Sequence, residues 1–188
     1  MPQIAFKDRL PWFHAAIAFY VAVEIGMASW LVAYLQDVRG AAVVDSNQSL
    51  ALFFAMIMMG RLLGGFFVQR AGYLRSIFFS SVGALACLLS GLYGPAVFLP
   101  FTGLFLSIIF PTITAAVSDM YVENINTILG VLFTFAGIGG VMGPWFIGLV
   151  SDHFGLQAGF SVTNLIFALL TSAFIFALLK GIQHGKTA

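Results

Sequence analysis

The chain has 188 residues, of which 61% are hydrophobic and 8% are charged, and its formal net charge is +1. Eight basic and seven acidic side chains are too few to cover an ordinary soluble domain of this length. The near-neutral charge also excludes the basic surface of a nucleic-acid-binding protein. The single cysteine, Cys87, lies in an apolar segment, so there is no disulfide framework. This composition indicates an all-α integral membrane protein, and membrane lipid is therefore one of its expected partners.

Six segments are long and apolar enough to cross a bilayer, which takes about 20 residues each. They cover 12–36, 50–68, 77–93, 96–117, 128–150 and 158–179. The joints between them hold charged residues, glycine and proline, which are typical of turns. We therefore predict a six-helix transmembrane domain over 12–179, with tails at 1–11 and 180–188.

The distribution of basic residues predicts the orientation. With the N-terminus inside, seven of the eight basic residues flank the inner ends of the helices, and only Arg39 flanks an outer end. Basic residues accumulate on the cytoplasmic side of inner membranes. The seven are Lys7, Arg9, Arg61, Arg70, Arg75, Lys180 and Lys186. We expect both tails to be cytoplasmic and the protein to lie in the cell membrane.

The first segment, FYVAVEIGMASWLVAYLQ, carries Glu24 near its middle. A carboxylate at that depth costs about 2.5–3.5 kcal/mol on insertion scales, unless it faces protein or water, or carries a proton. Helical spacing places Tyr20, Glu24, Ala28 and Leu31 on one stripe. Glu24 therefore binds a proton or a solute, or it is a structural residue that fixes helix packing, and the sequence leaves both readings open.

The second segment carries Arg61, nine residues before Arg70. Nine residues correspond to about 13 Å of helix rise, which is more than a comfortable snorkelling distance. Arg61 therefore faces protein or a water-filled vestibule. It binds an anionic or hydroxylated solute, gates the pathway with a carboxylate, or packs the inner helix junction. A pair with Glu24 is one arrangement that would satisfy both charges.

The last three segments carry small and polar residues. One face of the fourth segment holds Gly103, Ser107, Pro111, Thr114 and Ser118. Such faces pack helices closely, and contact with solute hydroxyls is the alternative. Thr134 and Asn164 are isolated polar residues, and Asn164 suits either an interhelical hydrogen bond or a solute contact. Pro111 and Pro144 interrupt helical hydrogen bonding and allow bending.

The three histidines, His14, His153 and His184, are far apart in the sequence and do not form a predicted metal site. We expect each of them to be solvated near the membrane surface. The chain has no CxxC, HExxH or phosphate-binding glycine motif, and Glu24 is its one deep acid. These absences argue against an enzyme and against a bound metal or cofactor.

Two helix ends share a pattern. The second segment ends GFFVQRAG and the fifth ends GLVSDHFG, so both read G-x-x-x-[Q/D]-[R/H]-x-G with an offset of 83 residues. At the same offset Gly60 matches Gly143. Three helices separate the copies, and an odd number reverses direction through the membrane. We therefore predict two inverted three-helix repeats, an arrangement found in secondary transporters.

These motifs resemble those of the major facilitator superfamily. GGFFVQRAGYLR resembles the signature between its eighth and ninth helices, with Gln69 in place of the usual aspartate. GIGGVMGPWFIG, residues 137–148, resembles its glycine–proline motif at the eleventh-helix position. YVAVEIGMASWLVAYL looks like the seventh helix of the fucose:proton symporter and sugar-transporter group. The resemblance implies the C-terminal six-helix half of a transporter.

The resemblance also implies roles for single residues and a partner. The partner would be a second six-helix half, either another copy of this chain or a separate N-terminal half. The candidates for solute binding and coupling to a proton or sodium ion are Glu24, Tyr20, Arg61, Thr114 and Asn164. The candidates for gating and packing are Gly60, Gly64, Gly65, Arg70, Gly72, Gly137, Gly140, Gly143 and Pro144.

The leading hypothesis is secondary active transport of a small solute such as a sugar by alternating access. One alternative is the substrate-capture membrane subunit of a multi-component vitamin importer, which has similar size and six spans but would not require the glycine repeat. The other alternative is a nonfunctional truncated half-transporter.

Overall fold

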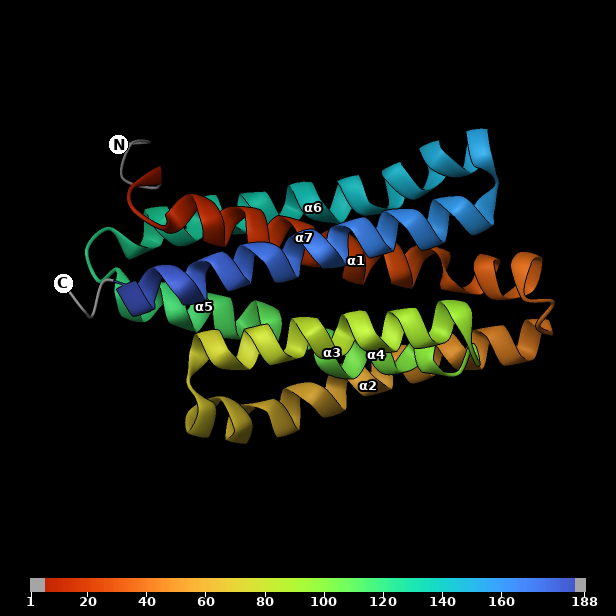
Figure 1. Cartoon of the computed structure of the whole chain (residues 1–188), viewed down its shortest axis with the longest axis horizontal. Helices are drawn as coiled ribbons and strands as arrows, with labels where there is room; N and C mark the ends of the chain where they lie inside the picture. The colour runs from red at the N-terminus through yellow and green to blue at the C-terminus, as the bar shows by residue number, and fades with distance from the viewer. Residues whose placement is uncertain (1–5, 185–188) are drawn as a thin grey trace.

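The computed structural model describes residues 6–184, which fold into helices without a β-strand. Figure 1 shows them as a bundle of roughly parallel rods. The elements are α1 (Leu10–Ala33), η2 (Tyr34–Val38), α2 (Val43–Ala71), α3 (Tyr73–Tyr93), α4 (Phe98–Leu106), α5 (Ile109–Met120), α6 (Ile125–Phe154) and α7 (Leu156–His184). Of the predicted tails, residues 1–5 and 185–188 lie outside this description, as do Lys186 and the His184 side chain.

Six rods within residues 6–184 have the length and hydropathy of membrane spans, as the sequence predicts. They are Leu10–Val38, Val43–Ala71, Tyr73–Tyr93, Phe98–Met120, Ile125–Phe154 and Leu156–Lys180. The first described turn of α1 and the end of α7 lie at the same end of the bundle, on the left of Figure 1. An even number of crossings requires this arrangement.

Several predicted boundaries are wrong, because helices continue past the apolar residues on which the prediction relied. The stretch 43–49, whose residues 45–49 are polar, forms the first turns of α2 instead of a loop. α6 extends to Phe154, so a single residue, Gly155, separates it from α7. A helix of 30 residues is about 45 Å long, which exceeds the hydrocarbon thickness and leaves its ends in the interface.

The predicted fourth span is one crossing made of two helices. α4 ends at Leu106 and α5 begins at Ile109. Pro111 has no backbone N–H, so the Ser107 carbonyl cannot receive its usual helical hydrogen bond. The break between the two helices coincides with that missing bond, so the predicted bend lies where the proline chemistry requires it.

The C-terminal end of α1 is fixed to two other helices. After α1 the chain forms a π-helical turn, η2. In η2, Gln36 donates a hydrogen bond to Ser46 Oγ of α2 at 2.7 Å. Beyond the turn, Arg39 donates to the carbonyl oxygens of Leu92 at 2.9 Å and Gly94 at 2.5 Å. A guanidinium at the C-terminal end of α3 satisfies carbonyls that lack helical donors and complements the helix dipole.

The two predicted repeats have matching backbone geometry. α2 ends at Gly72 with φ 81° and ψ 158°, and α6 ends at Gly155 with φ 82° and ψ 158°. This conformation is available essentially only to glycine. The middle helix of each repeat packs against the first helix of the other, α2 on α4 and α6 on α1. The fold is therefore a pair of interlocked three-helix units.

Glycines bring those helix pairs close together. A Cβ on Gly143 would clash with the Ala22 carbonyl oxygen of α1, and a Cβ on Gly139 would clash with Ala18. A Cβ on Gly60 would clash with Ser107 at the junction of α4 and α5. Close backbone approach between small residues is the usual basis of helix association in lipid. The predicted packing face of the fourth span is confirmed at Gly103, which lies against the Phe53 backbone.

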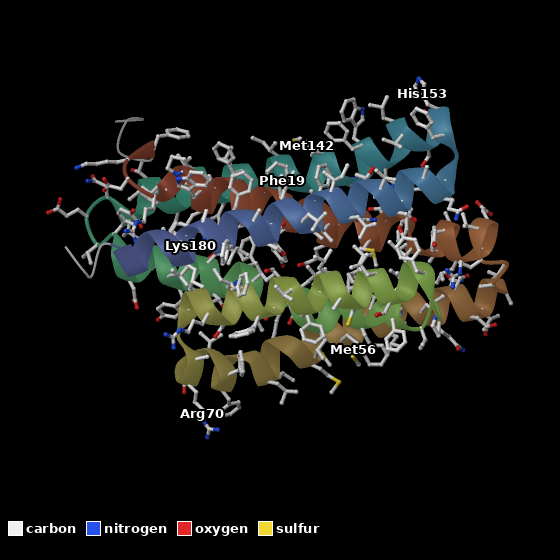
Figure 2. The ribbon with its side chains drawn as sticks, in the orientation of Figure 1. Phe19, Met56, Arg70, Met142, His153 and Lys180 are labelled. Carbon is white, nitrogen blue, oxygen red and sulfur yellow. The ribbon has the colours of Figure 1, made fainter. Side chains whose placement is uncertain are left out.

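The expectation that His14 is solvated is wrong. Its side chain is 1% exposed and its ring stacks on Phe135 of α6, with centroids 5.1 Å apart. Phe6 contacts the same ring edge-on at 5.6 Å. α1 begins two residues earlier than predicted and packs along α6, which covers the imidazole. His153 is exposed, as predicted, and lies at the opposite end of the bundle from Lys180 (Figure 2).

Candidate functional site

Three of the predicted functional residues meet near the middle of the bundle. Tyr20 and Glu24 are four residues apart on α1, so both project from the same face. The Tyr20 hydroxyl donates a hydrogen bond to the Glu24 carboxylate. Arg61 of α2 approaches the other carboxylate oxygen, with Nη2 3.9 Å from Oε1. The hypothesised Glu24–Arg61 pair is confirmed, and Tyr20 extends it to a cluster of three residues.

The local packing of α2 explains why Arg61 points towards α1. Gly60 and Gly64 are buried against the fourth crossing and fix that face of α2. Consecutive helical residues are about 100° apart around the axis, so Arg61 projects to the side of this contact. Its side chain is 56% exposed, whereas that of Glu24 is 15% exposed. The carboxylate is sheltered, and the guanidinium faces open space.

The cluster lies on the wall of the largest described cavity, which has a volume of about 640 Å³. Four crossings form its wall: α1, α2, α5 and α6. The lining residues are Tyr20, Val21, Glu24, Arg61, Phe110, Pro111, Ala136, Gly137 and Gly140. Its volume is within the range of small-molecule sites, which combine apolar walls with a few polar groups. Here the polar groups are those of the three-residue cluster.

The electrostatics of the site follow from its depth. Glu24 has fourteen residues on either side of it in the span Leu10–Val38, so it lies at mid-span. An ion pair in a region of low dielectric constant is strengthened, but removing either partner leaves a costly unpaired charge. The arrangement can hold a proton on Glu24, or it can present a cation and an acceptor to a polar solute.

The other two predicted solute contacts lie away from this cavity. The Thr114 hydroxyl donates to the Phe110 carbonyl at 3.0 Å, within its own helix. Asn164 is fully buried in α7, where its Nδ2 donates to the Phe160 carbonyl at 2.8 Å. Its Oδ1 lies 3.2 Å from the position that a Cβ on Gly26 would occupy. Asn164 thus contacts α1 on the face away from Arg61, but its Oδ1 has no hydrogen-bond partner among the described residues, so the interhelical hydrogen bond that the sequence left open is not observed.

The sequence did not indicate the apolar part of the cavity wall. Phe110, Ala136 and Val21 line it, yet nothing in the sequence distinguishes them from residues that face lipid or core. Pro111 was singled out for bending and as one member of the small and polar face of the fourth segment. Only knowledge of which helices meet could have identified these residues.

The predicted gating and packing residues fall into distinct groups. Gly60, Gly64 and Gly143 form tight helix contacts, whereas Gly65 and Gly137 face open space. The remaining residues of that prediction serve other positions: Gly72 ends α2, Gly140 lines the cavity, and Arg70 is exposed. Figure 2 shows the Arg70 side chain pointing away from the bundle.

Pro144 lies inside α6, which continues through it, and its carbonyl oxygen accepts a hydrogen bond from Trp30 Nε1 at 3.1 Å. This bond links α6 to α1 beside the close approach of Gly143. Within residues 6–184, no group of three or more potential metal ligands comes together.

The chain is similar in sequence to one known transporter and in structure to another. A Helicobacter pylori J99 protein named as a glucose/galactose transporter is 28% identical over 183 residues, which covers 92% of this chain and 43% of that protein. The crystal structure of the major facilitator superfamily transporter FucP in the outward conformation aligns with a TM-score of 0.75 and 22% identity, over 89% of this chain and 42% of FucP. A further structure of the E. coli fucose:proton symporter gives a TM-score of 0.78, also at 22% identity, over 93% and 43% of the two chains.

The chain has the fold of half a major facilitator superfamily transporter. The resemblance stated from the motifs is thereby confirmed, and so is the prediction of a six-helix half. No family model matches the sequence. The chain spans less than half the length of the proteins that it matches, and those relatives are described as transporters and symporters.

Proposed function

We propose that this chain is the C-terminal half of a secondary transporter that moves a sugar-like solute across the cell membrane by alternating access. The observation that carries the proposal is the cluster of Tyr20, Glu24 and Arg61 on a mid-span cavity. An intramembrane ionisable residue is by default a functional candidate, because lipid alone would not tolerate it. The H. pylori relative named for glucose and galactose, and the fucose:proton symporter, support a solute of this class.

A second six-helix half would complete the site. The cavity described here is open and has walls from four crossings of this half. In transporters of this architecture the solute lies between two halves that rock against each other. A separate N-terminal half or a second copy of this chain would supply the opposite wall. The close glycine contacts of α1 with α6, and of α2 with α4, would let this half move as a unit.

The proposed orientation places both termini in the cytoplasm. Arg70 and Lys180 lie at the end of the bundle where α1 begins, and His153 lies at the opposite end (Figure 2). The end with Arg70 and Lys180 also holds Lys7 and Arg9 beside the start of α1. The positive-inside rule makes this end cytoplasmic in the cell membrane. Arg39, at the far end, is engaged by the carbonyls of α3.

Glu24 is the residue to which we assign coupling. Its partners are one hydroxyl and one guanidinium, so its protonation changes the net charge of the cavity wall by one unit. A proton is the coupling ion that this arrangement favours; a sodium ion would instead need several oxygen ligands around the same carboxylate. The Tyr20 hydroxyl orients the carboxylate and can donate to its ionised form.

The test uses the complete transporter that contains this chain, reconstituted in proteoliposomes. Glu24→Gln should abolish gradient-driven uptake and spare counterflow, because exchange of bound solute needs no net proton transfer. Glu123→Gln, in an exposed loop between α5 and α6, is the matched control and should behave as the wild type. If Glu24→Gln keeps both activities, Glu24 does not carry the coupling proton.

The same assay separates the alternatives. Absence of solute flux with any six-helix partner would favour a nonfunctional half-transporter. Co-purification of the chain with two ATPases and a coupling protein would favour the vitamin-importer subunit instead.

A further inference from the structure

We propose that the solute meets this half through a carboxylate, which displaces Glu24 from Arg61 while Glu24 takes up the coupling proton. The proposal rests on the transport function above and narrows its solute class. The solute would be a carboxylate-bearing molecule, and a sugar acid is the sugar-like member of that class.

Arg61 is held loosely. Its Nη2 lies 3.9 Å from Glu24 Oε1, which is beyond hydrogen-bonding distance, and its side chain is 56% exposed. A guanidinium has five N–H donors in a planar fork that matches a carboxylate with two parallel hydrogen bonds. A carboxylate entering the cavity could therefore bind Arg61 more closely than Glu24 does. Glu24, at 15% exposure, would keep its contact with Tyr20.

The rest of the wall is poorly suited to a neutral sugar. Apart from the three clustered residues, the cavity is lined by Val21, Phe110, Pro111 and Ala136, together with two glycines. None of these side chains donates or accepts a hydrogen bond. On this half, the hydroxyls of a neutral hexose would find partners only at the three clustered residues, and the others would have to be satisfied by the opposite half at a cost for each one left unsatisfied. A solute with one carboxylate needs only the cation that this wall offers.

The charge balance points to the same class of solute. The empty wall holds one carboxylate and one guanidinium, so its net charge is zero. When a solute carboxylate arrives with a proton from the outer solution, the proton binds Glu24 and the solute anion replaces it at Arg61. The net charge is again zero, and release of both to the inside restores the starting state. A neutral solute carried with the proton would leave this half's wall with a net charge of +1, which the opposite half would have to compensate at low dielectric constant.

The groups around Glu24 allow this exchange. From α1 it faces Tyr20, and from α2 it faces Arg61. The lining residues of α5 and α6 are Phe110, Pro111, Ala136, Gly137 and Gly140, which have no titratable side chain. Proton uptake by Glu24 is therefore linked directly to whichever anion occupies Arg61, because like and unlike charges nearby decide which form of a carboxyl is favoured.

The experiment measures uptake by the complete transporter in proteoliposomes with radiolabelled glucuronate, and competition by unlabelled glucuronate, lactate, glucose and galactose. We expect glucuronate and lactate to compete at least tenfold better than the neutral sugars. Arg61→Gln should raise the half-saturating glucuronate concentration more than tenfold, and Arg61→Lys should restore part of the loss. Arg75→Gln, which removes an exposed inner basic residue, is the control and should not change it.

A second measurement distinguishes a loss of solute binding from a loss of folding. The double variant Glu24→Gln with Arg61→Gln leaves no unpaired charge, so it should retain the wild-type melting temperature and still fail to bind glucuronate. If the neutral sugars are transported and the carboxylates do not compete, the inference is overturned while the transport function stands. If no solute moves, the transport function fails, and this inference fails with it.

Discussion

The close approach of α1 to α6 can be tested by replacing Gly143 with alanine. A Cβ at this position would lie 2.8 Å from both the Cα and the carbonyl carbon of Ala22 and would clash with its oxygen. Ordinary carbon contacts are about 3.5–4.0 Å, so the two backbones would have to separate by about 1 Å. The atoms that must move belong to the helix backbone, and no flexible side chain can relieve the contact. Gly143→Ala should therefore destabilise the bundle.

The size of the effect follows from two opposing terms. Replacing glycine by alanine inside a helix gains about 1 kcal/mol, and overpacking a core costs about 1–3 kcal/mol. The control is Gly130→Ala, also in α6, where a Cβ meets nothing within 4 Å and only the gain applies. The two variants should differ by about 1–3 kcal/mol, and 1.4 kcal/mol corresponds to a tenfold change in the folded-to-unfolded ratio.

The measurement is unfolding of the purified transporter by titration with sodium dodecyl sulfate in mixed micelles, followed by tryptophan fluorescence. Gly143→Ala should unfold at a lower detergent fraction than the wild type, and Gly130→Ala at an equal or higher fraction. If both variants unfold together, α1 and α6 do not approach as closely as described, and the explanation of the repeat through close glycine contacts is refuted.

Two further predictions concern the ends of helices. Gly72→Ala and Gly155→Ala should each cost about 1–3 kcal/mol in the same unfolding assay, because both positions have a φ near +80° that alanine rarely adopts. A difference of more than about 2 kcal/mol between the two costs would contradict the structural equivalence of the two repeats. Arg39→Gln should cost about 1 kcal/mol through loss of charged donors to the α3 carbonyls, and Arg39→Lys should cost less. An Arg39→Gln variant with unchanged stability would show that this contact contributes nothing.

The sequence predicted the fold well where chemistry is local. Six apolar segments had no alternative to crossing a bilayer as helices, because each backbone polar group must be satisfied within lipid. The repeat was visible from the two helix exits, since Gly72 and Gly155 occupy a conformation that glycine alone adopts readily. Boundaries were less predictable. Polar residues such as those at 45–49 continue a helix into the interface, where hydropathy gives no signal.

The site was predictable only in part. Glu24 and Arg61 stood out individually because charges at mid-span are costly, and Tyr20 followed from helical spacing. That these residues meet depended on how α2 is turned by its contact with α4, which no spacing within one helix reveals. His14 shows the same limit: its burial comes from Phe135, 121 residues later in the chain, and nothing near it in the sequence indicated that contact.

What the sequence determined by itself is the environment and the local geometry: an apolar chain with few charges must span a membrane as helices, and glycine and proline mark where those helices end or bend. The tertiary structure alone decided which faces meet. It placed the Glu24 carboxylate beside the Arg61 guanidinium on one cavity, and it placed Thr114 and Asn164 elsewhere. The physical reason is that a helix fixes the direction of a side chain around its own axis, whereas the partner that it reaches depends on packing against the other helices.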